Sequence, residues 1–502
     1  MVSLILVSIL ALCSGLGHAA RTVKVPKTAP KGAGQPWSDF MSYSIEFGSL
    51  LDYAGNLSAP NDFSLNLLKN IGDISGTNPS IRVGGASQDR TTFIPEQKEA
   101  FIGTIIPVIS TDYPGRTTIG PAFFESLQTW PGFKFTYGLN YANLAVLNST
   151  AASIPYICRT LKSNLLAFEF GNEPDLFVLF HVRNATSWTD ASYVKEWTTA
   201  LSTIHNAALT ACSTPFALYG PTFAGLARGS LGNLTVLDPT TSWQAGLNAA
   251  HSIHYLATHN YMAVSTAPGL TLQGTLLNAT AIRSSVSSHT SFHARLLASD
   301  PSTPPLVLGE HNSLALQGRT GISDTFGAAL WNLAFNAQAA ASGVKRQHMH
   351  QGTNYRYQLW QPVATNYSKE ATKAPYYGNV ALAAFIGKNR DGKVRVADLG
   401  LEEETGAVFG AWKAGQLRRV LVVDLRGWNA TQTGPRPRGR YELDLLGGRC
   451  EGGVRRLGAA GSDATGGVTW DGISYDFETG RGKPVRVAKR TGEKVPVDRG
   501  GN

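Results

Sequence analysis

From residue 40 to about 387, short apolar or β-branched runs alternate with longer segments whose apolar residues recur at helical spacing. Eight runs have the length and composition of strands: 42–47, 80–85, 133–140, 165–173, 216–220, 253–261, 305–310 and 344–350. Helical segments between them include 64–74, 191–209, 281–299 and 324–342, and 376–386 closes the series. This alternation predicts an α/β fold, a (β/α)8 TIM barrel over residues 41–387. The alternative is a doubly wound open sheet, but no GxGxxG motif follows an early strand.

After residue 387 the pattern changes to short alternating segments separated by glycine-rich turns. They lie at 406–413, 418–425, 439–446, 467–478 and 483–490. Residues 388–502 are therefore predicted to form an all-β, β-sandwich-like accessory domain. Residues 20–40 precede the first barrel strand and are a candidate to add a strand to that domain.

The N-terminus resembles a secretion signal. Residues 2–12 are apolar over about half the roughly 20 residues that would span a bilayer, and small residues follow at Gly17 and Ala19. We expect a signal peptide over 1–19, cleaved after Ala19, with Ala20 as a second option. Seven Asn-x-Ser/Thr acceptor triplets support a secreted, extracellular glycoprotein. They begin at Asn56, Asn148, Asn184, Asn233, Asn278, Asn366 and Asn429.

The composition changes this picture in only two respects. The 502 residues are 43% hydrophobic and 16% charged, which excludes a disordered or disulfide-dense chain. The net charge is +9, and from Lys388 onward 21 basic residues face 15 acidic ones. The arginine clusters there lack interleaved aromatic residues, which favours a solvated basic surface, able to attract acidic polysaccharide, over a nucleic-acid-binding one. We expect a carbohydrate partner and neither nucleic acid nor membrane; the oligomeric state stays open.

Cysteine usage argues against a zinc site. Cys13 leaves with the signal, and Cys158, Cys212 and Cys450 remain without any CxxC pair. We expect one disulfide and one free thiol, with Cys158 and Cys212 as the candidate pair. Neither a metal nor an organic cofactor is implied.

Polar residues gather where the predicted strands end. In a parallel barrel the carboxyl ends of all strands meet at one mouth, and buried strands rarely end in polar groups merely to fill space. The set comprises Glu46, Arg82, Asn140, Asn172, Glu173, His259, Tyr261, Glu310 and His350.

Two carboxylates in this set indicate a reaction. Glu173 lies in FEFGNEP at the end of the fourth strand, and Glu310 lies in LGEHN at the end of the seventh. Glycoside hydrolysis requires such a pair, one carboxyl to protonate the leaving oxygen and one to attack the anomeric carbon or activate water. Either Glu could instead form a structural ion pair with an arginine. The combination of Asn-Glu-Pro with a second strand-end Glu favours catalysis.

These motifs resemble clan A glycoside hydrolases. Within the clan, SIEFGSLLDYAGN (44–56), IRVGGASQD (81–89), HQGTNYRYQLWQP (350–362) and the β-rich tail resemble family 79. The resemblance spans roughly residues 40–502 and implies a retaining double displacement. It implies that Glu173 is the general acid/base, Glu310 the nucleophile, and Asn172 a ligand of the sugar 2-hydroxyl. Tyr261 and Arg82 are placed to keep Glu310 ionised.

Further candidates have a structural alternative beside the functional one. Glu46 is either a sugar ligand or a partner of Arg82, and His259 is either a ligand contact or a buried structural histidine. Gln88 and Asp89 either reach the sugar or cap a helix. Tyr355, Tyr357 and Trp360 either pack or form an aromatic wall of the cleft.

The resemblance predicts an exo-acting β-glucuronidase that releases glucuronic acid or 4-O-methylglucuronic acid. Such an enzyme must hold the uronate carboxylate, and some relatives place a tyrosine five residues after the nucleophile. That position is Ala315 here, so Tyr261, Tyr355 and the amides around Gly352 are the expected substitutes. The alternatives are another exo-β-glycosidase, cleaving glucosides, xylosides or galactosides, and a catalytically silent carbohydrate-binding protein. Catalysis by a protonated Glu173 predicts an acidic pH optimum.

Overall fold

The computed structural model of the chain describes residues 2–7, 21–445 and 452–492. Most of the predicted signal segment and Cys450 therefore lie outside the described residues. Eight parallel strands close into a barrel in the order β10-β11-β12-β13-β3-β4-β8-β9, which confirms the predicted fold class. The barrel strands are β3 (Met41–Glu46), β4 (Ser80–Gly84), β8 (Lys134–Leu139), β9 (Leu165–Phe170), β10 (Leu218–Phe223), β11 (Ile253–Val264), β12 (Leu306–Ala315) and β13 (Arg346–Gln351).

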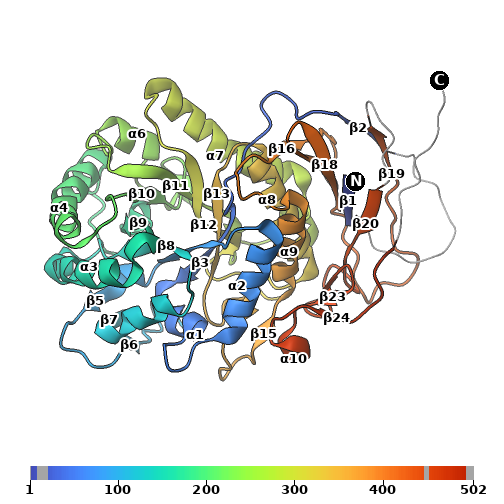
Figure 1. Ribbon diagram of the computed structural model, residues 1–502. Coiled ribbons are helices and arrows are strands. Elements are labelled where there is room, and N and C mark those ends of the chain that lie inside the picture. The colour runs from blue at the N-terminus through green and yellow to red at the C-terminus, as the bar shows by residue number, and fades with distance from the viewer. Residues whose placement is uncertain (1, 8–20, 446–451, 493–502) are drawn as a thin grey trace.

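Helices surround the barrel, as Figure 1 shows. Several begin where a polar side chain accepts a hydrogen bond from a backbone N–H of the first turn: Asn61 before α2, Thr189 before α4, Asn278 before α7 and Thr325 before α8. The principal helices are α2 (Asp62–Ser75), α3 (Leu147–Leu161), α4 (Asp190–Ala211), α7 (Ala279–Ser299), α8 (Phe326–Ala341) and α9 (Ala374–Ile386). Shorter ones are α1 (Leu50–Ala54), α5 (Ser230–Asn233), α6 (Pro239–Gln244) and α10 (Phe477–Gly480).

The connection from β4 to β8 departs from the simple alternation. It holds a small three-stranded sheet followed by the 3-10 helix η3 (Pro121–Gln128) in place of one long helix. The strands of that sheet are β5 (Thr91–Phe93), β6 (Phe101–Thr104) and β7 (Arg116–Ile119). The sequence pattern did not predict this excursion, because strands of three or four residues carry too little periodicity.

The C-terminal region is a two-layer β structure. Its main sheet has the order β16-β17-β18-β1-β20, and β2 pairs with β19 to form a second layer. The strands are β1 (Val2–Val7), β2 (Arg21–Val25), β16 (Arg395–Asp398), β17 (Gly406–Lys413), β18 (Gln416–Asp424), β19 (Tyr441–Leu445) and β20 (Gly452–Arg455). A separate antiparallel sheet follows, built of the two-residue strands β21 (Leu457–Gly458), β22 (Thr469–Trp470), β23 (Ile473–Ser474) and β24 (Val485–Arg486). In addition, β14 (Trp360–Gln361) pairs with β15 (Ala371–Thr372) as a two-stranded sheet.

Alternation along β17 and β18 divides the two faces of the main sheet. Val408, Val420 and Val422 pack with β2 and β19 on the outer face. Phe409 and Leu421, one residue out of phase, belong to the large core that also contains the barrel helices. This two-residue period explains why the alternating pattern of the tail predicted a sandwich-like domain.

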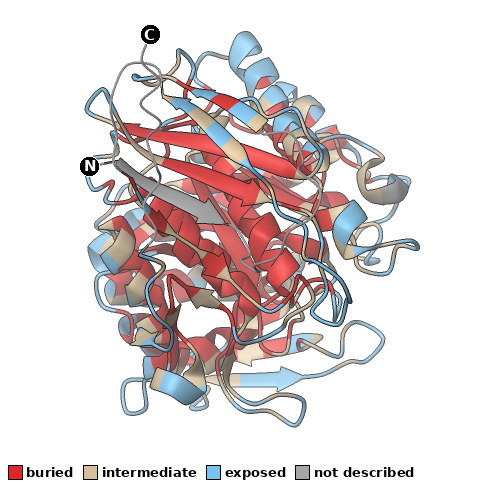
Figure 2. Ribbon diagram, turned by 90° about the vertical axis from the view of Figure 1, so that its right-hand side faces the viewer, coloured by how far each residue is buried: buried red, intermediate tan, exposed pale blue. Residues whose placement is uncertain are grey.

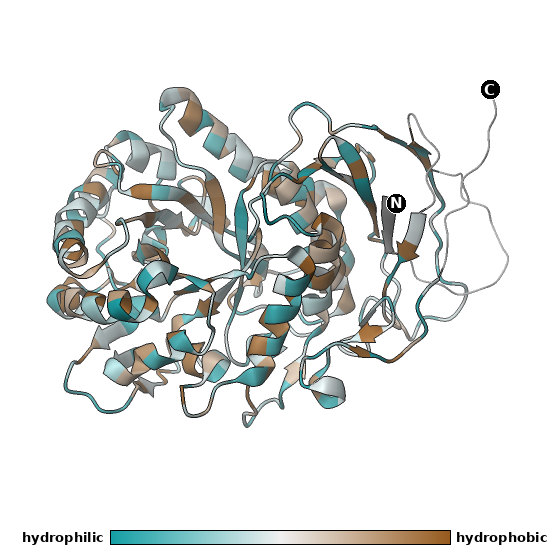
Figure 3. Ribbon diagram, viewed as in Figure 1, coloured by the Kyte–Doolittle hydropathy of each residue, from teal (hydrophilic) through white to brown (hydrophobic). Residues whose placement is uncertain are grey.

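Helices α8 and α9 are buried between the barrel and the C-terminal sheet. All residues of α9 are buried, and Figure 2 shows these layers as the red interior of the molecule. In Figure 3 the ribbon of the outer helices and loops carries many hydrophilic residues, coloured teal, beside hydrophobic ones. A helix that is apolar on every side needs neighbours on every side, and the accessory sheet provides one of them. In the described part of the chain no helix has both the length and the apolarity needed to cross a bilayer.

Two further features concern the predicted termini and cysteines. The 20–40 segment contributes β2, which pairs in parallel with β19, so it adds a strand to the C-terminal region. Cys158 at the end of α3 forms a disulfide with Cys212, which directly follows α4.

Candidate active site

The turn after β9 places Glu173 at the barrel mouth. Gly171 adopts φ +92°, and a Cβ there would lie 2.9 Å from the Tyr141 ring, so glycine is required. Glu173 itself has φ 51° and ψ 53°, a left-handed conformation that costs a non-glycine residue about 1–2 kcal/mol. Its backbone N–H donates to the carbonyl of Thr222 (3.1 Å), and the Thr222 hydroxyl donates to the carbonyl of Gly171 (3.0 Å). Neighbouring strands β9 and β10 therefore hold the turn in its strained form.

Two buried aspartates tie the surrounding loops together. Asp175 accepts N–H bonds from Ala224 and Gly225, both at 3.0 Å, which joins the loop after β9 to the loop after β10. Burial raises its pKa to about 8, with the charge of Glu173 adding to the effect. Asp89 accepts N–H bonds from Asn172 (2.7 Å) and Tyr141 (2.8 Å), so its carboxylate fixes the chain just before Glu173.

Glu310 lies at the bend of β12 among hydrogen-bond donors. Arg82 donates to its Oε2 at 2.6 Å, and the Tyr261 hydroxyl donates to its Oε1 at 2.7 Å. Burial opposes ionisation, but the charges of His350, His259 and Arg82 together with the Tyr261 hydroxyl outweigh it and hold the pKa of Glu310 well below its usual range. Glu310 is therefore ionised at neutral pH, as a nucleophile must be.

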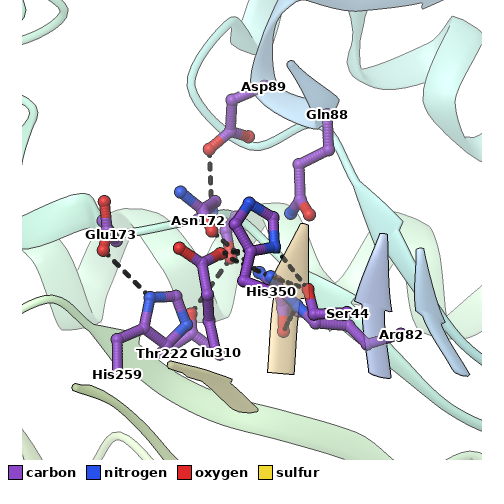
Figure 4. A network of polar contacts seen from close by, with 12 residues as sticks. Ser44, Arg82, Gln88, Asp89, Asn172, Glu173, Thr222, His259, Glu310 and His350 are labelled. Carbon is purple, nitrogen blue, oxygen red and sulfur yellow. Dashed lines mark hydrogen bonds and ion pairs between the residues drawn. The ribbon is translucent and has the colours of Figure 1, made fainter. Parts of the chain in front are cut away.

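Glu173 has the opposite protonation preference. Burial, reinforced by the negative charge of Glu310, raises the pKa of Glu173 to about 8. Its Oε1 lies 3.0 Å from Nδ1 of His259, whose own pKa burial lowers to about 4 (Figure 4). Glu173 is protonated over most of the pH range in which Glu310 is ionised. Two carboxyls with separated pKa values are the signature of an acid and a nucleophile.

The two carboxyls are close together. Ligand atoms of Glu173, His259 and Glu310 all lie within 4.8 Å of one another. Inverting glycosidases separate their carboxyls by about 6.5–9.5 Å to admit a water, whereas retaining enzymes use about 5–5.5 Å. Among the described residues this trio is also the set that could bind a metal ion, although Arg82 beside Glu310 already supplies a positive charge there.

Arg82 organises the floor of the site from inside the barrel. It is fully buried and ion-pairs with both Glu169 and Glu310, and it donates to Asn172 Oδ1 at 2.8 Å and to the Ser44 hydroxyl at 2.9 Å. Asn172 is thereby oriented with its amide oxygen toward Arg82, which leaves its amide nitrogen for a sugar hydroxyl. The predicted alternative pairing of Arg82 with Glu46 is not formed.

Glu46 instead belongs to a second buried cluster. It accepts from the Ser87 N–H (2.8 Å) and from the Tyr355 hydroxyl (3.0 Å), and His350 Nε2 lies 3.3 Å from it. Gly352 packs beneath this cluster, where a Cβ would lie 2.8 Å from the Tyr355 ring. The hydroxyl of Tyr355 is therefore occupied, which removes it as a free ligand for a uronate.

These groups surround a pocket of about 460 Å³, within the range typical of small-molecule sites. The structure brings most predicted residues to its wall, and some lie behind it. Those that line the pocket are Glu46, Asp89, Asn172, Glu173, Tyr261, Glu310, Ala315, His350 and Tyr357. Those that do not are Arg82, Gln88, Asn140, His259, Gly352, Tyr355 and Trp360.

The residues behind the wall have structural contacts. Gln88 is buried over Gly84 and Gly138, and Trp360 stacks edge-on against Tyr43 and Tyr53 in the core. His259 lies behind the wall and acts on the pocket through its contact with Glu173 and through its charge, which lowers the pKa of Glu310. This placement does not fit direct sugar contact by Gln88, Tyr355 or Gly352. The sequence motifs predicted such contact because they do not show which way a side chain points.

Several residues of the pocket were not predicted from the sequence. Arg90 and Tyr113 line it, with the guanidinium 5.9 Å from the centre of the Tyr113 ring. Among the described residues Arg90 has no carboxylate partner. Arg90 directly follows the predicted residues Gln88 and Asp89, so its place in the sequence could have identified it as a pocket residue. Tyr113 comes from the β5–β7 excursion, where the sequence showed no pattern.

The acceptor asparagines lie mostly on the surface. Six of the seven are exposed, and Asn278 is half-buried because its side chain caps α7. Glycosylation itself stays a prediction.

Comparison with known proteins adds to this geometry. Residues 408–502 match the model of the glycosyl hydrolase family 79 C-terminal beta domain. The chain is 40% identical to a β-glucuronidase of Aspergillus niger, with 96% of this chain and 91% of that protein covered. It is 39% identical to a β-glucuronidase of Neurospora crassa, with 93% and 90% covered. Among solved structures, a 4-O-α-L-rhamnosyl-β-D-glucuronidase of Fusarium oxysporum is similar with a TM-score of 0.75 and 25% identity, covering 94% of this chain and 95% of that one.

Proposed function

This chain belongs to glycoside hydrolase family 79, and from that premise we propose that it is an exo-acting, retaining β-glucuronidase. The observation that carries the proposal is the pair Glu173 and Glu310, held close together with pKa values displaced in opposite directions. A carbohydrate-binding protein has no use for such a pair.

The first half of the reaction forms a covalent intermediate. The ionised Glu310 attacks the anomeric carbon while Glu173 gives its proton to the glycosidic oxygen, so the C–O bond breaks and the aglycone leaves as an alcohol. The Asn172 amide nitrogen donates a hydrogen bond to the pyranosyl 2-hydroxyl and so positions the ring, and hydrogen bonds at this hydroxyl strengthen in the transition state. Tyr261 and Arg82 transfer their hydrogen bonding from the free carboxylate to the ester oxygen.

The second half returns the enzyme to its starting state. Once Glu310 is esterified, its negative charge is gone and the pKa of Glu173 falls, so Glu173 acts as a base. It takes a proton from water, whose oxygen attacks the anomeric carbon and releases Glu310. Two displacements give glucuronic acid with its original anomeric configuration.

Recognition of a uronate is supported by charge as well as by the relatives. Arg90, which has no carboxylate partner in the described part of the chain, places a positive charge on the pocket wall, and Tyr113 lies beside it. An arginine can bind a carboxylate through two parallel hydrogen bonds. The backbone around Gly352 lies behind the wall.

The test is hydrolysis of p-nitrophenyl β-glucuronide, β-glucoside, β-xyloside and β-galactoside by the purified protein. We expect kcat/KM for the glucuronide to exceed that for the glucoside by at least about 100-fold, because a charged contact is lost with the neutral sugar. Arg90→Ala should reduce this preference while leaving glucoside turnover unchanged. Glu310→Gln is the blank and should lower turnover by roughly 1,000-fold or more. Faster turnover of a neutral sugar would show that the scaffold serves another exo-β-glycosidase activity.

We further propose that the protein is secreted as a glycoprotein after removal of residues 1–19. The apolar run, the small residues before Ala20 and the exposed acceptor asparagines support this proposal. An extracellular location also suits an enzyme that acts on glycans or glycosides outside the cell.

A further inference from the structure

The mouth of the catalytic pocket carries large apolar side chains that face solvent. Leu179, Phe180, Leu234 and Leu316 are 40%, 43%, 36% and 48% exposed, and all four line the same pocket as Glu173 and Glu310. Exposed leucine or phenylalanine is common in isolation, but a cluster of them around one concave site marks a surface that a ligand covers. The cluster is assembled from three different loops, so one apolar loop does not account for it.

Three members of the cluster, Leu179, Phe180 and Leu234, lie on the side where the leaving group is expected. Glu173 must contact the glycosidic oxygen to protonate it, so the aglycone extends over the segment that follows Glu173. That segment supplies Leu179 and Phe180, and the loop pinned to it through Asp175 leads to Leu231 and Leu234. The charged residues come from other strands: Glu46 is the last residue of β3, and Arg90 lies in the connection after β4. The pocket therefore has a charged side for the sugar and an aliphatic side for what is attached to it.

The backbone holds two of these leucines in an unfavourable conformation. Leu231 has φ 54° and Leu316 has φ 59°, in the left-handed region that bulky residues avoid. Each such residue costs on the order of 1–3 kcal/mol, and strain of this kind persists where surrounding structure enforces a geometry needed for function. Both leucines line the pocket wall.

We propose that the aglycone is a lipophilic alcohol or phenol rather than a sugar, so that the natural substrates are glucuronides of apolar small molecules. A second sugar unit would need hydrogen-bond partners for its hydroxyls, and aliphatic side chains offer none. An apolar aglycone instead removes the exposed leucine and phenylalanine surface from water. This inference rests on the proposed glucuronidase function and specifies its substrate class.

The experiment compares three substrates that all release a primary alcohol: methyl β-D-glucuronide, octyl β-D-glucuronide below its micellar concentration, and β-glucuronosyl-(1→6)-glucose. The departing group has the same chemistry in each case, so differences in kcat/KM report contacts with the aglycone. Each methylene removed from water favours binding roughly fourfold, so burial of only two predicts at least a tenfold advantage for the octyl over the methyl compound. We expect the disaccharide to be no better than the methyl compound.

Matched variants test whether the apolar residues at the pocket mouth cause the octyl advantage in kcat/KM. The double variant Leu179→Ser/Phe180→Ser should reduce the octyl advantage to about threefold or less and leave the methyl rate within about twofold. Leu209→Ser is the control, because Leu209 is 64% exposed on α4 and does not line the pocket. It should leave all three rates unchanged.

The outcomes separate this inference from the function on which it rests. Equal kcat/KM for octyl and methyl glucuronides, or a clear preference for the disaccharide, overturns the lipophilic aglycone and leaves the glucuronidase function standing. An octyl advantage that survives the double variant also overturns it. If none of the three glucuronides is cleaved, the proposed function itself fails.

Discussion

Arg82 lies fully buried on β4 between the carboxylates of Glu169 and Glu310, and it also donates to Ser44 and Asn172. One guanidinium thus offsets two buried negative charges and orients the asparagine that faces the sugar. The planar arrangement of its donors allows this, and a lysine with a single ammonium would not reproduce it. Glu169 was part of the FEFGNEP motif, yet its role depends on Arg82 from a strand 87 residues away.

Replacement of Arg82 should therefore destabilise the fold as well as the site. Arg82→Met leaves two buried carboxylates without their counter-charge, and we expect the free energy of unfolding to fall by about 3–5 kcal/mol. Denaturant unfolding measures this loss. The control is Arg228→Met: Arg228 pairs with Asp190 but is 58% exposed, so its loss should cost less than about 1 kcal/mol. Equal effects of the two replacements would contradict the account of Arg82.

The displaced pKa values predict the pH dependence of catalysis. The active form has Glu310 ionised and Glu173 protonated, so kcat/KM should rise through the lowered pKa of Glu310, level off, and fall above about pH 8 as Glu173 ionises. The raised pKa of Glu173 extends activity from the acidic range expected from sequence up to neutral pH. A profile of p-nitrophenyl glucuronide hydrolysis from pH 3 to 10 tests this range.

The matched variant for this profile is Glu173→Gln. It should lose the alkaline decline while still forming the covalent intermediate, because p-nitrophenol leaves without protonation. An unchanged decline near pH 8 in Glu173→Gln would assign that limb to another group, such as Asp175, whose pKa burial also raises to about 8.

At the scale of elements, α8 and α9 connect the barrel to the accessory sheet. They pack against each other, and α8 also contacts β16, β17 and β18 of the C-terminal sheet. Their contact is close because α9 has a glycine where it crosses α8: a Cβ on Gly378 would lie 2.4 Å from the carbonyl oxygen of Ala329. The uniformly apolar sequence of both helices predicted burial but not which layers would bury them.

Gly378→Ala should therefore force the two helices apart. We expect a loss of about 1–3 kcal/mol in the free energy of unfolding, as for other overpacked cores. Gly466→Ala is the control, since no atom lies within 4 Å of a Cβ built there, and it should change stability by less than about 0.5 kcal/mol. Thermal or denaturant unfolding of both variants measures these changes in the free energy of unfolding. A neutral Gly378→Ala would mean that α9 can shift without cost.

At the scale of the whole molecule, the two ends of the sequence meet in one layer. β2 pairs with β19, Gly34 bridges to Val396, and the Trp412 indole donates to the carbonyl of Pro26 at 3.0 Å. The barrel is therefore inserted between the two parts of the accessory region along the chain, as the blue and red segments on one side of Figure 1 show. Residues 21–40 belong structurally with 388–502 although the barrel separates them in sequence.

The N-terminal segment gives a test at this scale. In the full chain Val2–Val7 forms β1 between β18 and β20, whereas cleavage after Ala19 would remove that strand. We expect N-terminal sequencing of protein secreted by a eukaryotic host to begin at Ala20, or at Arg21 if the second option is used. Removal of N-linked glycans should also lower its mass. An intact Val2 in the secreted protein would mean that β1 is a permanent strand of the sheet.

The sequence by itself determined the eight barrel strands and the β-rich tail, and it singled out Glu173 and Glu310 as the candidate catalytic pair. Strand and helix periods are local properties, and parallel strands in a closed barrel must end at the same mouth. Glu173 just after β9 and Glu310 at a register irregularity within β12 are therefore both placed near this mouth. For the same reason Tyr261 and Asn172 could be expected in the site from sequence alone.

Only the tertiary structure decided which side chains face the sugar and which support it. Gln88 and Tyr355 turn inward, Arg90 and Tyr113 line the pocket, and the aliphatic mouth comes from loops without periodicity. The pKa values of Glu173 and Glu310 likewise depend on charges contributed by strands far apart in the chain. Side-chain direction, burial and charge proximity arise from contacts between distant segments, and no local pattern in the sequence encodes them.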